Sequence, residues 1–212
     1  MKKFHKAVSF IFQPLLMPTY GIIVFLFTDL ANFFMPVWKW FAIGGTFLFT
    51  ALLPAMPILL MLKNGQIKDL YISKKEQRTF PYMFSIIAYV FWTIFLWRIL
   101  HLPHFFVAMG IGSILSIIII TIVNLKWKIS AHLSGVGGLT GGVFAYSFIM
   151  GVNPVFAMIA MLFISALTAF SRIELKAHTP GQTLAGFTVG FLTVFIAGIL
   201  VSEQIIKFPE IG

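Results

Sequence analysis

Long runs almost free of charge alternate along this chain with short segments that carry most of its charged residues. An uncharged apolar run of about 18 residues or more predicts a helix that crosses a membrane. Such runs predict an all-α fold, a polytopic transmembrane helical bundle of about six to seven spans. The predicted spans are residues 7–33, 40–62, 82–100, 104–125, 134–150, 155–170 and 181–202.

We interpret residues 1–212 as a single membrane-embedded domain. Pro14 and Pro18 lie within the first span and predict a kink or break near its start, because proline cannot donate the helical hydrogen bond. We expect this span, residues 7–33, to lie at the periphery of the core. The second span carries Pro54 and Pro57 in its second half.

Three polar segments lie on the same membrane face when the spans are counted from the N-terminus. These segments are residues 63–81, 126–133 and 171–182, and they hold the residues with chemical potential. The opposite face receives only short turns. This shared placement predicts that the three segments build one site at one membrane surface.

Basic residues are distributed unequally between the two faces. Of 15 lysine and arginine residues, only Lys39, Arg98 and Lys207 fall on the face opposite the three polar segments. The positive-inside rule therefore predicts a cytoplasmic N-terminus and a cytoplasmic site. The net charge of +9 indicates contact with anionic lipid headgroups rather than with nucleic acid. The cysteine-free, phenylalanine-rich composition favours a bacterial inner membrane.

Cations, hydroxyls and histidines gather in the three polar segments. Cations and hydroxyls hold phosphate oxygens, while a histidine can attack phosphorus or protonate a leaving oxygen. This inventory predicts phosphoryl transfer. The plainer alternatives are that the cations contact lipid phosphates and that Ser130 only caps the following helix. The candidate residues are Lys74, Lys75, Arg78, Ser130, His132, Ser171, Arg172 and His178.

Ser171-Arg172, followed after five residues by His178, resembles the third motif of the type-2 phosphatidic acid phosphatase family. That family shares its site with vanadium haloperoxidases. Ile129-Ser130-Ala131-His132 is similar to a degenerate form of the family's second motif, Pro-Ser-Gly-His. Lys74 or Lys75, with Arg78 and Pro81, resembles a loose form of the first motif.

The resemblance implies a role for each matching residue. His178 would be the nucleophile and His132 the general acid for the leaving group. Phosphate oxygens would be held by cations and hydroxyls, and neither a metal nor another cofactor is implied. The phosphate-holding residues would be Arg172, Arg78, Lys74 or Lys75, Ser130 and Ser171.

The chain departs from the family pattern beside the nucleophile. Where the family has an aspartate, this chain has Gln182, which can orient an imidazole but supplies no charge. Glu174, four residues before His178, is a candidate substitute for the missing carboxylate. Ile129 and Ala131 replace the proline and glycine of the second motif.

We therefore expect a phosphatase that hydrolyses a lipid phosphate or isoprenoid diphosphate through a phosphohistidine, with the lipid chains remaining in the bilayer. The first alternative is an inactive relative that binds anionic lipid, and the second is a small transporter. Glycines spaced four apart, such as Gly186 and Gly190, allow close helix packing. We expect this packing within the bundle, with a homodimer face as the alternative.

Overall fold

The computed structural model describes residues 2–70, 72 and 74–202, and these residues form helices and loops without a strand. Seven helical segments are long and apolar enough to cross a membrane, which confirms the predicted all-α multi-pass bundle. They span Lys2–Leu26, Pro36–Lys63, Lys75–Ile99, His104–Lys126, Ala131–Met150, Val155–Glu174 and Pro180–Val201.

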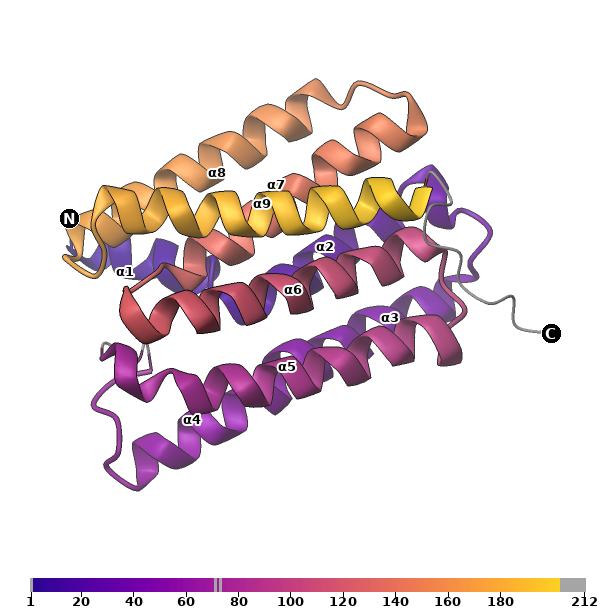
Figure 1. Ribbon diagram of the computed structural model, residues 1–212. Helices are drawn as coiled ribbons and strands as arrows, with labels where there is room; N and C mark the ends of the chain where they lie inside the picture. Colours follow the sequence, from indigo (N-terminus) through magenta and orange to yellow (C-terminus); the bar gives the residue numbers. More distant parts are fainter. Residues whose placement is uncertain (1, 71, 73, 203–212) are drawn as a thin grey trace.

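Several spans are built from more than one helical piece (Figure 1). Proline causes the clearest interruption: Pro14 begins a 3₁₀ turn after α1, because its ring and missing N–H disrupt the preceding turn. The α-helices are α1 (Lys2–Ile11), α2 (Met17–Leu26), α3 (Pro36–Phe47), α4 (Leu53–Lys63), α5 (Thr79–Ile94), α6 (His104–Lys126), α7 (Ala131–Met150), α8 (Val155–Glu174) and α9 (Pro180–Ser202). The shorter pieces are η1 (Pro14–Leu16), η2 (Asp29–Ala31), η3 (Leu48–Leu52), η4 (Lys75–Gln77) and η5 (Phe95–Ile99).

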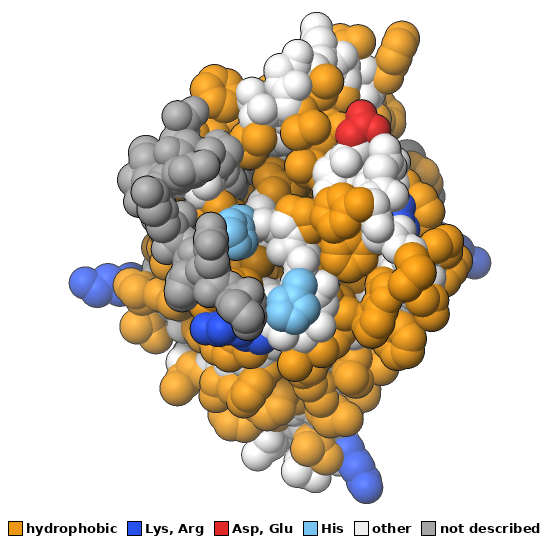
Figure 2. Space-filling model, turned by 90° about the vertical axis from the view of Figure 1, so that its right-hand side faces the viewer, with side chains coloured by type: hydrophobic (Ala, Val, Ile, Leu, Met, Phe, Trp, Pro, Cys, Tyr) orange, Lys and Arg blue, Asp and Glu red, His pale blue; other side chains and the backbone are white. Residues whose placement is uncertain are grey.

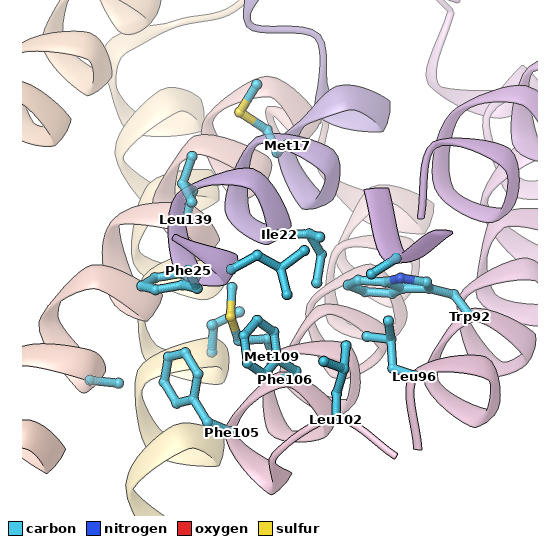
Figure 3. Packing of buried hydrophobic residues seen from close by; sticks show 14 of the residues in the cluster. Met17, Ile22, Phe25, Trp92, Leu96, Leu102, Phe105, Phe106, Met109 and Leu139 are labelled. Carbon is cyan, nitrogen blue, oxygen red and sulfur yellow. The ribbon is translucent and has the colours of Figure 1, made fainter. Parts of the chain in front are cut away.

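The first span contributes to the centre of the bundle, contrary to the expectation that residues 7–33 lie at its periphery. Ile22 and Phe25 of α2 are each 1% exposed and pack among residues of the other helices (Figure 3). Helix α2 ends at Leu26, earlier than the predicted residue 33, and a short turn follows. Beyond Leu26, Phe27 and Phe33 are exposed, while Ala31 is buried within the turn region rather than in a continued helix. Hydrophobicity alone therefore extended the predicted span too far.

Helices α7 and α9 pack closely through their glycines. A Cβ added to Gly137 or Gly141 would collide with the backbone of Phe187 or Phe191, and one at Gly190 would collide with the backbone of Ser134. The predicted packing of these glycines within the bundle is therefore confirmed. The contact extends to the helix ends, where the Ser130 N–H donates to the Gln182 carbonyl oxygen at 3.2 Å.

The two ends of the bundle differ in what they carry. The N-terminus and the α4–α5, α6–α7 and α8–α9 connections gather at one end (Figure 1, left). The α2–α3, α5–α6 and α7–α8 connections lie at the other end, which is viewed end-on in Figure 2. The predicted placement of the three polar segments on one side is thus the arrangement seen in the bundle.

Candidate functional site

A cavity of about 1220 Å³, counted with the part that is open to solvent, reaches into the end of the bundle that carries the three polar segments. Arg78, His132, Arg172 and His178 all line it. They come from the three polar segments singled out in the sequence, so residues that are distant along the chain share one cavity. Two histidines and two arginines around one space can receive an anion and act on it.

A sharp chain reversal after α8 brings His178 back beside Arg172. The N–H groups of Ala177 and His178 both donate to the Arg172 carbonyl oxygen, at 3.0 and 3.3 Å. Lys176 adopts a left-handed backbone with φ of 54°, which turns the chain at this point. The Ser-Arg-x₅-His spacing therefore lets arginine and histidine face one cavity from a helix end and the loop after it.

Gln182 determines the proton position on His178. The Thr179 N–H donates to Gln182 Oε1 at 3.2 Å, which identifies this atom as the amide oxygen. His178 Nδ1 lies 3.1 Å from the same oxygen and must carry the proton to donate to it. His178 Nε2 is then left with the lone pair, as a nucleophile requires.

The surroundings of His178 favour its neutral form. Burial is the largest cause, and the positive charges of Arg78, Arg172 and Lys128 add to it, which together lower the pKa of His178 to about 3. The Gln182 hydrogen bond acts in the opposite direction but is weaker. The imidazole is therefore neutral throughout the physiological pH range.

Lys128 belongs to the electrostatic surroundings of the cavity, although the sequence interpretation did not include it among the site residues. Burial lowers the pKa of its ammonium group, Arg78 and Arg172 lower it further, and Asp69 raises it. The signal available in the sequence was its place two residues before Ser130, in the same polar segment as His132. A lysine near a membrane boundary usually extends to the headgroups, so the position of Lys128 in the sequence did not indicate that it lies near the cavity.

Arg78 joins two of the polar segments. Its Nε donates to the Ile72 carbonyl oxygen at 2.8 Å, and its terminal nitrogen donates to the Ile129 carbonyl oxygen at 3.2 Å. The side chain is 4% exposed, as is that of Arg172. Carbonyl acceptors hold the guanidinium in place without cancelling its charge, so Arg78 remains able to attract an anion.

His132 contacts the first helix. Its Nε2 lies 3.1 Å from the Ser9 carbonyl oxygen, which can only accept, so Nε2 carries the proton. His5 of the same helix contacts Ser171, with 3.2 Å between Nδ1 and Oγ. Nothing in the sequence pattern indicated that α1 covers this end of the site.

The other predicted site residues have different surroundings. Ser130 caps α7, since its Oγ accepts from the Leu133 N–H at 3.4 Å, as the plainer alternative expected. The Lys75 ammonium donates to the carbonyl oxygens of Leu125 and Lys126 at 3.3 and 3.0 Å, at the end of α6. Lys74 and Glu174 are exposed. None of these residues, nor Ser171, is among those that line the cavity.

In the part of the chain that the structure describes, no group of three histidine, cysteine, aspartate or glutamate residues is arranged to hold a metal ion. Comparison of the chain with protein-family models, with curated proteins and with solved structures finds no match.

Proposed function

We propose that this protein is a membrane-embedded phosphatase that hydrolyses a lipid phosphate or diphosphate through a phosphohistidine intermediate. The observation that carries the proposal is the convergence of Arg78, Arg172, His132 and His178 on one cavity from three polar segments. The motif resemblance to the type-2 phosphatidic acid phosphatases supports the same chemistry, with the divergences noted above.

The first step is attack by His178 on phosphorus. Nε2 carries the lone pair because Gln182 holds the proton on Nδ1, and the ring is neutral at physiological pH. The N–P bond forms as the bond from phosphorus to the lipid oxygen breaks. Arg78 and Arg172 stabilise the charge on the remaining phosphate oxygens.

Departure of the lipid oxygen requires a proton, which His132 is placed to give. The step requires the imidazolium form of His132, with a proton on each ring nitrogen; its Nε2–H exchanges the Ser9 carbonyl oxygen for the leaving oxygen, and the ring is left neutral. Water then attacks the phosphohistidine and gives a proton to the neutral His132. The N–P bond breaks, its electron pair returns to His178 Nε2, inorganic phosphate leaves, and both histidines regain their starting protonation states.

Gln182 favours one competing function. A carboxylate at this position would stabilise the positive charge that develops on the attacking imidazole, and an amide does not. An inactive relative that binds anionic lipid would keep the cations and would tolerate this change. The first experiment must therefore separate binding from hydrolysis.

The test is phosphate release by purified protein from a panel of lipid monophosphates and diphosphates, with chelator present and without added metal. Release that disappears in a His178→Ala variant, together with acid-labile phosphate trapped on the wild-type protein, is the expected result. Lipid binding by wild type without release from any substrate would overturn the phosphatase and favour the binding protein.

The distribution of basic residues supports a site that faces the cytoplasm of a bacterial cell, with the membrane being the inner one. Lys39 and Arg98 lie at the opposite end of the bundle, and Lys207 lies outside the described residues. A reporter fused after Gly212 is then expected to be extracytoplasmic. Cytoplasmic reporter activity would contradict the seven-span topology with this orientation.

A further inference from the structure

The cavity is deeper than a phosphate group requires. Beyond the arginines and histidines, its lining continues to Trp92 of α5, Met109 of α6 and Leu139 of α7. Pro81 and Trp92 both line it from α5, and a helical rise of 1.5 Å per residue separates them by about 16 Å. Figure 3 shows Trp92, Met109 and Leu139 approaching the centre of the bundle from their different helices.

The deep part of the cavity presents mainly apolar groups. Three of the four serines that line the cavity are bonded within the protein: Ser85 donates to the Pro81 carbonyl oxygen at 2.8 Å, and the hydroxyl oxygens of Ser116 and Ser134 lie 2.6 Å apart. The Trp92 indole N–H donates to Thr46 Oγ1 at 2.9 Å. With these polar atoms already paired, an apolar occupant matches the space better than a polar one.

One wall of the cavity comes from the segments that proline interrupts. Pro14, Leu15 and Pro18, around the break in the first span, line it together with Ile58 of α4. All of these residues are partly exposed. A chain in the surrounding lipid would reach the cavity here without passing through water.

We propose that the apolar chain of the substrate lies inside the bundle, entering between the Pro14–Pro18 break and Ile58 and ending against Trp92 and Met109. The identity of its phosphate head rests on the proposed function. Because the chain end is enclosed, its length determines whether it fits. The substrate class is then a lipid phosphate with one apolar chain of moderate length, rather than one whose chains all remain in the bilayer.

The test uses dodecyl phosphonate that carries a photoreactive diazirine at the chain end. Its carbon–phosphorus bond resists hydrolysis, so the readout does not require catalysis. After irradiation of the full-length protein in lipid nanodiscs, labelled positions are read by mass spectrometry. Labels at Trp92, Met109 or Leu139 are expected. Labels confined to lipid-facing side chains, such as Phe91 and Ile119, would overturn the proposal.

A chain-length series tests the enclosed end. Affinity of the wild-type protein for alkyl phosphonates is expected to rise about fourfold per added methylene and to stop rising before hexadecyl. Ser113→Phe fills the cavity on α6 and is expected to weaken dodecyl binding at least tenfold while sparing octyl binding. Ile119→Phe, on the exposed side of the same helix, is the matched control and should leave octyl and dodecyl binding unchanged.

Equal loss of octyl and dodecyl binding in Ser113→Phe, with the protein folded, would contradict an enclosed chain. If that variant does not fold, Met109→Ala is used instead, because it enlarges the deep end of the cavity. Its affinity is expected to keep rising up to longer alkyl chains than in the wild-type protein. Affinity that stops rising at the wild-type chain length contradicts the proposal. Internal labels without hydrolysis of any substrate would refute the phosphatase alone. Hydrolysis that is indifferent to chain length, with only external labels, would refute the enclosed chain alone.

Discussion

The arginines at the two ends of this bundle have different surroundings. At the end with the cavity, Arg78 and Arg172 are each 4% exposed and lie near His178 and Lys128. At the other end, the Lys39 ammonium lies 5.1 Å from the centre of the Phe27 ring, and the Arg98 guanidinium lies 3.9 Å from that of Trp97. That end presents a largely hydrophobic face with scattered basic side chains (Figure 2).

This difference distinguishes cations that anchor a helix at the membrane boundary from cations that bind an anion. Cations stacked on aromatic rings are typical of a membrane–water boundary, where they help to hold a helix in place. Buried guanidinium groups that line the same cavity cost free energy through desolvation and repulsion. A bound anion offsets that cost, so the end with buried cations is the one at which a phosphate is expected to bind.

Removing one histidine at each end of the bundle is expected to give the largest difference in activity between the two ends. His178→Ala is expected to reduce phosphate release by about a thousandfold or more, because it removes the proposed attacking atom. His101→Ala, at the opposite end, should stay within about twofold of wild type. Both are measured as kcat/KM on the best lipid phosphate. Comparable losses in the two variants would show that His178 acts through stability rather than chemistry.

Removing one buried cation should have the next largest effect. Arg172→Gln is expected to lower kcat/KM by about 10²- to 10³-fold, the usual cost of losing a donor that stabilises transition-state charge. Arg98→Gln is the matched change at the other end and should have little effect. A parallel titration with inorganic phosphate is expected to show weaker binding only in the first variant; unchanged binding there would exclude Arg172 from the anion site.

Substitution of Gln182 is expected to have a smaller effect, which appears in the pH dependence of kcat/KM. The wild-type pKa of His178 is lowered to about 3, so the ring stays neutral as pH falls from 8 to 5 and no acid loss of activity arises from it. In Gln182→Asp the nearby carboxylate favours the protonated ring and should raise this pKa by about 1–3 units. The acid limb of kcat/KM then moves toward neutral pH in the variant.

Imidazole NMR signals follow the same titration directly, which separates it from ionisation of the substrate. Gln182→Asn is the matched control, since it changes the reach of the side chain without adding charge. A wild-type His178 signal that titrates near its ordinary value of about 6.5 would remove the electrostatic basis for a neutral nucleophile.

Much of the fold was predictable because apolar runs in this chain are long and their polar interruptions are short. The same rule failed at the first span, where apolar residues such as Phe33 continue beyond the end of α2. Hydrophobicity records compatibility with lipid but not which helix lies at the centre. The central packing of Phe25 depends on contacts with residues from distant spans, and no local pattern reveals those contacts.

For the site, the motif resemblance predicted which arginines and histidines share the cavity, because each lies where a polar segment meets a helix end. It did not distinguish those residues from neighbours of the same chemical type. Lys75 resembles a phosphate ligand in sequence, yet its ammonium group binds the end of α6. Which direction a side chain takes from a loop depends on tertiary contacts, such as those that draw Arg78 to Ile72 and Ile129.

The smallest expected effect concerns the packing that holds the site together. Gly190→Ala places a methyl group against the Ser134 carbonyl, and neither backbone can move away without separating α9 from α7. The α7–α9 contact carries the Ser130–Gln182 hydrogen bond at its end, and Gln182 in turn holds His178. We expect a loss of about 1–3 kcal/mol in stability and a modest fall in kcat.

Gly44→Ala is the matched control, because nothing lies within 4 Å of its added Cβ and alanine favours the helix. Thermal unfolding in detergent compares the two, and equal melting temperatures would mean that close α7–α9 packing does not stabilise the bundle.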